Sequence, residues 1–291
     1  MPTAMITGAN VGQANMLVKK LAARGWRVFA GVLPGADTDL KPSAQITLVD
    51  QDVSDYASVE ASAKVVDEAL NGDGLDLIMN VAGVANMAQG TIEGLRYEEL
   101  QKMFAINTFG QLAVCQQFLP MMRRTTALGR QPGKIFNYGS GAVVANPPTA
   151  GAYNMTKHAA HGMTMTLRLE LAPFGIQVTS IWPGAVKTAM TDNARESTKN
   201  AWAKQPEHLQ KLYEPYLKKG VCEVLPEMIE SKGSTADAVT DETLKLLEKK
   251  KLKPFYLVGK DAKPLGPMAR LLPNSAFEAI LRSTYKIPAK S

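Results

Sequence analysis

The first 182 residues alternate short apolar runs with longer segments whose apolar residues recur at helical spacing. The apolar runs predict strands at residues 4–7, 26–32, 46–50, 75–81, 134–140 and 176–182, and a further strand at 254–259. The longer segments predict helices at 11–25, 55–71, 96–119 and 151–173, the last two ending near Pro120 and at Pro173. Strands that alternate with helices are typical of a parallel sheet covered on both faces.

The pattern therefore predicts an α/β fold, a doubly wound parallel sheet of the Rossmann-like kind, in a single domain over residues 1–291. Residues 188–235 break the alternation, because they are polar, helical and irregular. Residues 236–263 supply the last helix and strand. Residues 264–291 form a tail whose first twenty residues are amphipathic and rich in Pro and Leu.

Composition excludes several classes of protein. The hydrophobic fraction of 45% and the net charge of +6 are ordinary for a globular protein of 291 residues and argue against a nucleic-acid partner. The densest basic run, at 248–253, closes an amphipathic segment and is interpreted as a solvated helix end. Two cysteines and three histidines make neither a disulfide framework nor a metal motif. No signal peptide or membrane span is visible, so we expect a cytoplasmic protein.

A glycine-containing turn follows the first predicted strand, in TGANVGQA at residues 7–14. Gly8 allows a sharp turn, and Gly12 allows the backbone to approach a pyrophosphate at the start of the next helix. The spacing differs from GxGxxG, and Ala14 stands where a third glycine is common. Asp52, after the third strand, suits the adenine edge of a nucleotide; its alternative role is to cap the helix that begins near Asp55.

The end of the second strand leaves the choice of dinucleotide open. An acid there would bind the ribose 2′-hydroxyl of NAD, and an arginine would accommodate the 2′-phosphate of NADP. The sequence has Val32, Leu33 and Pro34, with Asp37 and Asp39 later in the loop. The absence of a nearby arginine gives a slight preference for NAD.

Two Tyr-x-x-x-Lys pairs occur in the chain. Tyr153 and Lys157 lie on a predicted helix, where side chains four apart are neighbours. Tyr256 and Lys260 lie in a β-rich run closed by Gly259, and on a strand the same spacing separates two residues by ~13 Å. Only the first pair can act together.

These motifs occur in a fixed order along the chain. TGANVGQ, DVSD, NVAG at 80–83, INTFG, NYGS, the Tyr153–Lys157 pair and WPGAVKT at 182–188 follow one another on the predicted frame. This order and spacing resemble the short-chain dehydrogenase/reductase family over about residues 3–190, and more loosely to about 260. Ala14 and the single serine of NYGS depart from the commonest family pattern.

The resemblance implies a role for each matched residue. Tyr153 is the expected general acid/base, Lys157 its partner, Ser140 the residue that binds the reacting oxygen, and Asn107 the fourth catalytic member. The expected NAD or NADP contacts are Gly8, Asn10, Val11, Gly12, Asp52, Val53, Asn80, Ala82, Gly83, Tyr153, Lys157, Pro183, Gly184, Val186 and Thr188. Residues 1–187 become the nucleotide-binding and catalytic core, and 188–235 a substrate-binding lid.

The chemistry agrees with these roles. Hydride transfer between a carbinol carbon and nicotinamide requires a proton to leave or join the oxygen. A lysine ammonium ~4 Å from a phenol favours the phenolate by ~4 kcal/mol at an effective dielectric constant of ~20. We therefore expect Lys157 to lower the pKa of Tyr153 from ~10 to ~7, and Asn107 to hold a water beside Lys157.

The loops at the carboxyl ends of the strands predict the substrate class. Met87, Gly141, Val143, Pro147 and Met190 line the expected pocket, and no basic cluster accompanies them. A lipophilic secondary alcohol or its ketone of steroid, retinoid or aryl type fits such a pocket. GWRVFAGVL, the region of Tyr213 and Tyr216, and PFYLVGKDAKPLG are similar to the retinol- and hydroxysteroid-dehydrogenase branch of the family.

Other interpretations remain at this point. The chain could be a nucleotide-binding regulatory protein without catalysis, a reductase of small polar carbonyl compounds, or an epimerase or dehydratase on the same fold. The resemblance implies a homodimer or homotetramer through helices 96–119 and 151–173. The amphipathic tail is expected to pack on the body or on a partner subunit, with a membrane surface as the alternative.

Overall fold

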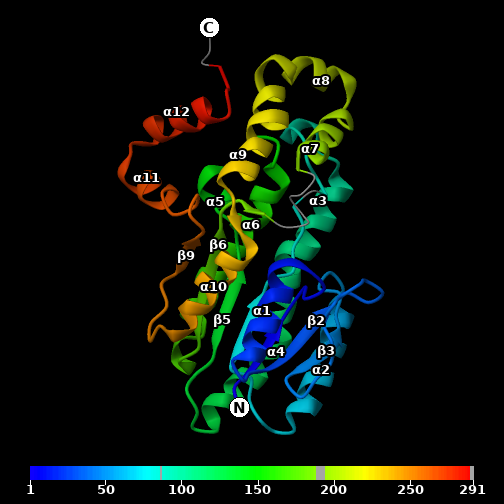
Figure 1. Cartoon of the computed structure of the whole chain (residues 1–291), viewed down its shortest axis with the longest axis vertical. Coiled ribbons are helices and arrows are strands. Elements are labelled where there is room, and N and C mark those ends of the chain that lie inside the picture. The colour runs from blue at the N-terminus through cyan, green and yellow to red at the C-terminus, as the bar shows by residue number, and fades with distance from the viewer. Residues whose placement is uncertain (86, 188–193, 289–291) are drawn as a thin grey trace.

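The computed structural model describes residues 1–85, 87–187 and 194–288, and its centre is one seven-stranded sheet (Figure 1). All neighbouring strands in it pair in parallel, in the order β3-β2-β1-β4-β5-β6-β9. The strands are β1 (Thr3–Ile6), β2 (Arg27–Val32), β3 (Ile46–Asp50), β4 (Leu77–Asn80), β5 (Lys134–Tyr138), β6 (Gln177–Pro183) and β9 (Phe255–Val258). The predicted doubly wound sheet is confirmed, and the strand order reverses between β1 and β4.

Helices cover both faces of the sheet, as the alternation predicted. The helices are α1 (Gly12–Ala23), α2 (Tyr56–Leu70), α3 (Tyr97–Phe104), α4 (Gly110–Ala127), α5 (Ala142–Ala145), α6 (Gly151–Glu170), α7 (Ala194–Ala203), α8 (Glu207–Tyr213), α9 (Leu225–Lys232), α10 (Ala236–Lys245), α11 (Leu265–Leu271) and α12 (Asn274–Thr284). One face packs against α1 and α10, and the other against α2, α4 and α6.

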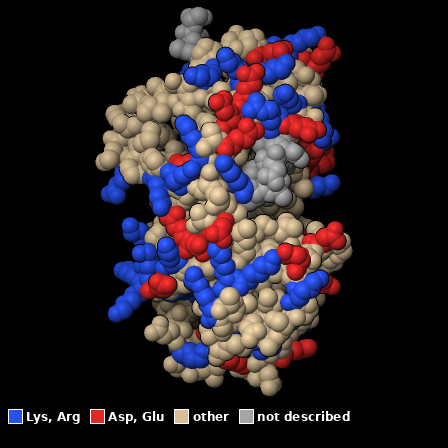
Figure 2. Space-filling model, in the orientation of Figure 1, with Lys and Arg blue, Asp and Glu red and all other residues tan. Residues whose placement is uncertain are grey.

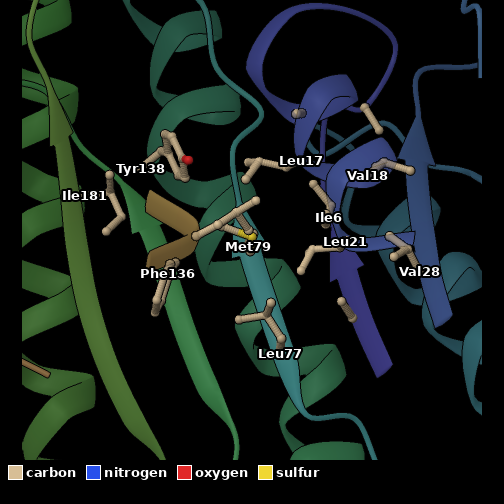
Figure 3. Close-up of a cluster of buried hydrophobic side chains, with 14 of the residues drawn as sticks. Ile6, Leu17, Val18, Leu21, Val28, Leu77, Met79, Phe136, Tyr138 and Ile181 are labelled. Carbon is tan, nitrogen blue, oxygen red and sulfur yellow. The ribbon is translucent and has the colours of Figure 1, made fainter. Parts of the chain in front are cut away.

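Two apolar layers separate the sheet from its helices. Leu17, Val18 and Leu21 of α1 are fully buried against strand residues such as Ile6 and Met79 (Figure 3). Their spacing of three and four residues places them on one helical face. On the other side, Phe118 of α4 lies in a second cluster with residues of α2 and α6. Burial of whole apolar side chains on both faces contributes ~1.5–3 kcal/mol each.

The expected helix end at Pro120 is wrong. Helix α4 continues through Pro120 to Ala127, although proline removes one backbone hydrogen bond. Met121, Met122 and Thr125 beyond the proline are buried, and the Thr125 hydroxyl donates to the carbonyl of Leu75 at 2.9 Å. The packing of this last turn therefore outweighs the local effect of the proline.

Residues 194–232 form a helical region above the sheet, built from α7, α8 and α9 with two π turns between the last two helices (Figure 1). Trp202 is buried there with Val221 and Cys222. Short strands β7 (Val186–Lys187) and β8 (Ser234–Thr235) pair at the base of this region. The described part of the chain contains no helix both long and apolar enough to cross a membrane.

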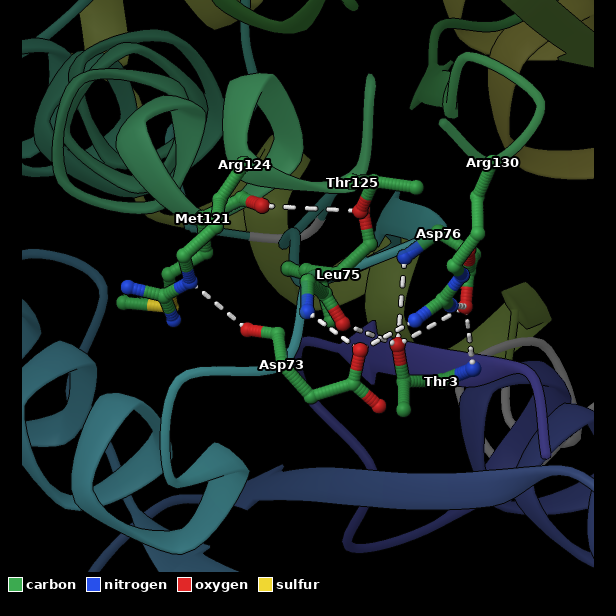
Figure 4. Close-up of polar contacts among 9 residues, drawn as sticks. Thr3, Asp73, Leu75, Asp76, Met121, Arg124, Thr125 and Arg130 are labelled. Carbon is green, nitrogen blue, oxygen red and sulfur yellow. Dashed lines mark hydrogen bonds and ion pairs between the residues drawn. The ribbon is translucent and has the colours of Figure 1, made fainter. Parts of the chain in front are cut away.

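The amino ends of β1 and β4 are tied by a polar network (Figure 4). The Asp76 carboxylate accepts from the Thr3 backbone N–H at 2.7 Å and from the Thr3 hydroxyl at 3.0 Å. Arg130 pairs with both Asp76 and Asp73. Because Thr3 is buried, its N–H depends on this carboxylate.

We expect Asp76→Ala to lower the free energy of unfolding by about 2 kcal/mol, because it leaves a buried backbone donor without an acceptor. Urea denaturation measures the change. The control is Glu60→Ala, which removes an exposed i,i+4 pair with Lys64 and should change stability by less than about 0.5 kcal/mol. Equal effects of the two substitutions would contradict the assigned role of Asp76.

Candidate active site

The turn between β1 and α1 has the geometry that binding of a dinucleotide needs. Gly8 and Gly12 have φ of 69° and 67°, in the left-handed region that favours glycine. A Cβ on Gly8 would lie 2.8 Å from Cα of Ala82, whereas a Cβ on Gly12 would meet nothing within 4 Å. Gly8 thus permits close packing of two strand ends, and Gly12 leaves space for a ligand.

The first turn of α1 also has donors to offer. Val11 occupies the N-cap and makes no side-chain capping bond, so the helix N-terminus retains free N–H groups and its positive dipole end. Ala14 is buried in the core beneath the turn. The residues at this end therefore fit a pyrophosphate group.

Asn10 fixes the loop that follows β2. Its Oδ1 accepts from the backbone N–H of Leu33 at 2.7 Å, and its Nδ2 donates to the carbonyl of Ala36 at 3.2 Å. Asp39 accepts from Asn15 at 2.8 Å and pairs with Lys19 at 2.7 Å. These bonds lower the pKa of Asp39, the Lys19 hydrogen bond most strongly. Asn15 was not predicted from the sequence, and its buried amide joins the glycine turn, through the carbonyls of Ala9 and Asn10, to Asp39 in the loop after β2.

Asp52 and Val53 lie at the carboxyl end of β3. The Asp52 carboxylate accepts from the backbone and the hydroxyl of Ser54 at 2.9 and 2.6 Å. Asp55 itself caps α2 by accepting from Ala57 at 3.0 Å, so the alternative capping role of Asp52 is wrong. Val53 is buried, and its backbone closely approaches Gly110 of α4.

The end of β4 packs against the glycine turn. The Thr7 hydroxyl accepts from the backbone N–H groups of Val81 and Ala82, each at 3.0 Å. Asn80 is buried, and its amide donates to Asn137 at 2.8 Å, so its side chain lies in a polar network beneath the site. Gly83 lies beside Asn107 and Lys157, since its Cβ would be 3.1 Å from Asn107 Oδ1 and 3.5 Å from Lys157 Nζ.

Helix α6 brings Tyr153 and Lys157 to one face. The Lys157 ammonium lies 5.5 Å from the centroid of the Tyr153 ring and donates to the carbonyl of Tyr138 at 2.9 Å. Ser140 follows β5, and its Oγ accepts from the backbone N–H of Ala142 at 3.1 Å. The second pair of equal spacing differs as predicted, since Tyr256 lies on β9 and Lys260 beyond its end.

Burial sets the proton affinities of these groups. It lowers the pKa of the Lys157 ammonium to about 8. It raises the pKa of the Tyr153 phenol, an effect that a hydrogen bond with Ser140 opposes in part. The expected lowering of the Tyr153 pKa by Lys157 is wrong for the polypeptide alone, because removal of the phenolate from water dominates.

Asn107 lies in a π turn, Ala105–Phe109, between α3 and α4. Its side chain accepts from the Val84 N–H and donates to the Val84 carbonyl, both at 2.8 Å, and donates to Thr156 at 3.1 Å. A π turn inside a helix often marks a functional site. Here it holds Asn107 fully buried between the β4 loop and α6.

A cavity of about 260 Å³ joins these elements. Gly83, Ser140, Tyr153 and Lys157 line it together with the turn Pro183–Val186 after β6. Gln13 of α1 lines it as well and was not identified from the sequence. Thr188 lies outside the described residues.

A second cavity of about 690 Å³ adjoins the first, since Ser140 and the turn at Pro183–Ala185 line both. The predicted pocket residues Gly141 and Pro147 line it, whereas Met87 lines a separate, polar hollow beside α7. Val143 lies on α5 and lines neither the larger cavity nor the hollow beside α7. Met190 is outside the described residues. Much of the wall comes from residues that the sequence analysis did not identify: Leu225, Met228, Ile229, Leu265, Met268 and Phe277.

Comparison with known proteins shows the family of the chain. The model of the short chain dehydrogenase family matches residues 2–199. The chain is 30% identical over 293 residues to 17-beta-hydroxysteroid dehydrogenase type 6 of Rattus norvegicus, covering 98% of this chain and 89% of the relative. It is 29% identical over 304 residues to retinol dehydrogenase 5 of Mus musculus, with the same coverage of both chains.

Solved structures share the fold over nearly the whole chain. A short chain dehydrogenase of Burkholderia cenocepacia in complex with NADP superposes with a TM-score of 0.72 at 23% identity, covering 96% of this chain and 97% of that one. A second, from Burkholderia phymatum in complex with NAD, has a TM-score of 0.68 at 23% identity, with 97% and 92% covered. The chain is therefore an NAD(P)-dependent enzyme of the short-chain dehydrogenase/reductase family, in the branch of the hydroxysteroid and retinol dehydrogenases.

Proposed function

We propose that the enzyme interconverts a lipophilic secondary alcohol and its ketone, with Tyr153 as general acid/base. The observation that carries this proposal is that two neighbouring cavities share Ser140 in their lining. One contains Tyr153 and Lys157 and adjoins the glycine turn, and the other is large and mainly apolar. A substrate hydroxyl bound to Ser140 would have Tyr153 as its proton acceptor in one cavity. The apolar body of the same substrate would have space in the other.

Each side chain has a distinct part in oxidation of the alcohol. Ser140 holds the hydroxyl oxygen, and the Tyr153 phenolate takes its proton as the carbonyl forms. The Gly8–Gly12 turn would hold the pyrophosphate of NAD(P), and Pro183–Val186 would border its nicotinamide, which would supply the hydride acceptor. Lys157 stabilises the phenolate, and Asn107 fixes the β4 loop beside Lys157. Reduction of the ketone reverses both transfers.

The lipophilic substrate class rests on the relatives and on the lining of the larger cavity. The relatives are named for hydroxysteroids and retinol. Apolar side chains of α9, α11 and α12 supply eight of the 23 residues that line the cavity, and the volume suits a ligand of drug size. A small polar carbonyl compound would leave these apolar surfaces uncovered. We further infer that residues 194–232 act as the substrate lid, since α9 lines both cavities.

Association into dimers or tetramers through the long helices stays a prediction. Phe109 and Leu112, at the junction of the π turn and α4, and Met155 of α6 expose apolar side chains on the helices expected to form this interface. Apolar residues clustered on such faces are typical of protein–protein contacts.

Tyr153→Phe should lower kcat about 10²–10⁴-fold, because the reacting oxygen loses its general acid/base. Absorbance at 340 nm reports turnover, and quenching of intrinsic fluorescence reports cofactor binding, which should change little. The matched control is Tyr256→Phe, because Tyr256 belongs to the equally spaced pair but lies on β9, and its turnover should be near that of wild type. Unchanged turnover by Tyr153→Phe would rule out the proposed role.

Burial of Lys157 should cost stability at neutral pH. Its pKa is about 8 in the folded chain and 10.5 in the unfolded one, so the unfolded state binds more protons between these values and stability rises there with pH. We expect Lys157→Met to be more stable than wild type by about 2 kcal/mol at pH 7 and by much less above pH 10. The substitution removes the hydrogen bond from Lys157 to the Tyr138 carbonyl, but this carbonyl keeps a donor, because Gln111 also donates to it at 3.0 Å. Urea denaturation at both pH values measures the difference, and a pH-independent difference would contradict it.

We propose that NAD binds more tightly than NADP. No arginine lies in the loop after β2, and Lys19 is paired with Asp39. Asp39→Asn keeps an acceptor for Asn15 but releases Lys19, so it should raise the affinity for NADP relative to NAD by about threefold. Calorimetric titration of both cofactors into both proteins tests this. Tighter binding of NADP to wild type would overturn the preference.

A further inference from the structure

The C-terminal helices α11 and α12 form a bridge over the larger cavity. At one end, α11 contacts α5, and Gly266 lies against Leu257 of β9. At the other end, Tyr285 is buried, and a Cβ on Gly220 would overlap its carbonyl oxygen. The bridge is therefore attached to the body at both ends (Figure 1).

Between these attachments, α12 lacks a packed core. No residue of α12 is buried, although Phe277, Ile280 and Leu281 follow the i, i+3, i+4 spacing of one apolar face. All three line the cavity, whose opposite wall is α9. Figure 2 shows that the surface over α11 and α12, at the upper left, is mostly uncharged, whereas charges of both signs cover α7 and α8. An amphipathic helix normally buries such a face against other side chains.

We propose that the apolar face of α12 is a specificity-determining surface that packs on the body of the substrate and selects bulky apolar alcohols. This inference rests on the proposed function, and it deepens it. Ser140 and the apolar face of α12 line the same cavity of about 690 Å³, so a substrate that reacts at Ser140 and fills this volume with a large apolar body would contact α12. Contact with such a body removes the exposed apolar face of α12 from water, which a small alcohol cannot do.

If α12 selects substrates by size, substitutions on its apolar face should impair binding of a large alcohol and leave oxidation of a small one unchanged. Phe277→Ala and Ile280→Ala should each raise KM for a tetracyclic secondary alcohol about tenfold with kcat within twofold, because apolar contact with the body is lost. Both variants should oxidise cyclohexanol with kcat/KM within twofold of wild type. Leu271→Ala is the matched control, since Leu271 lies on α11, is 78% exposed and does not line the cavity.

A second measurement does not depend on turnover. Hydrogen exchange of the enzyme with NAD should show slower exchange in residues 274–284 when a tetracyclic ketone is added, and no change with cyclohexanone. The Phe277→Ala variant should lose most of this protection. Phe277→Leu, which retains apolar contact, should keep part of it.

The outcomes separate this inference from the proposed function. If the wild type oxidises cyclohexanol, and Phe277→Ala loses the same factor in kcat/KM for cyclohexanol and for the tetracyclic alcohol, or loses none for either, the role of α12 is overturned. The proposed function stands in that case. Absence of turnover for every alcohol would overturn the proposed function. In that case, slower hydrogen exchange of residues 274–284 with the tetracyclic ketone still supports the apolar face of α12 as a binding surface. Unchanged exchange overturns the role of α12 as well.

Discussion

The site depends on the parallel direction of the seven strands, which places all their carboxyl ends at one edge of the sheet. Where the strand order reverses, the ends of β1 and β4 must approach closely. Gly8 makes this possible because it has no Cβ to meet Ala82, and the Thr7 hydroxyl accepts from the two N–H groups that follow β4. Every proposed catalytic side chain is then attached to a loop or helix that starts from this edge.

Local chemistry explains what could be predicted from the sequence. Apolar runs alternating with helical patterns predicted the doubly wound sheet, and a spacing of four on a helix predicted that Tyr153 and Lys157 share a face. These features depend on neighbours in the chain. The end of α4 could not be predicted in this way, because the burial of Met121 and Met122 against distant strands overcomes the effect of Pro120.

The substrate cavity was the least predictable part, since its wall combines α9 with α11 and α12. The amphipathic pattern at 264–283 was a usable signal, but a sequence pattern does not say what covers an apolar face. The pKa of Tyr153 was predicted in the wrong direction for a related reason. A charge–charge estimate considered one neighbour, whereas burial in the folded chain acts on both groups.

Two features lower stability where function is proposed. A lysine is kept in a buried position in which its charge is disfavoured, and an apolar helical face is left beside a cavity. A protein selected for stability alone would replace the first with an apolar residue and fill the second. The buried Lys157 and the apolar face of α12 would both stabilise the complex of the enzyme with its cofactor and an apolar substrate.

The π turn at Ala105–Phe109 also sets the rotation of one helix relative to another. A π turn is equivalent to one residue inserted into an α-helix, and each residue turns the helix by about 100°. Because the wide turn absorbs this residue, the helices on either side keep their register, and Met103 and Phe118 are both buried. Deletion of one residue would restore a regular α turn and remove the wide turn that presents the Asn107 amide to Val84. This junction is thus sensitive to chain length as well as to residue type, and homologous chains should keep its length even where its residues differ.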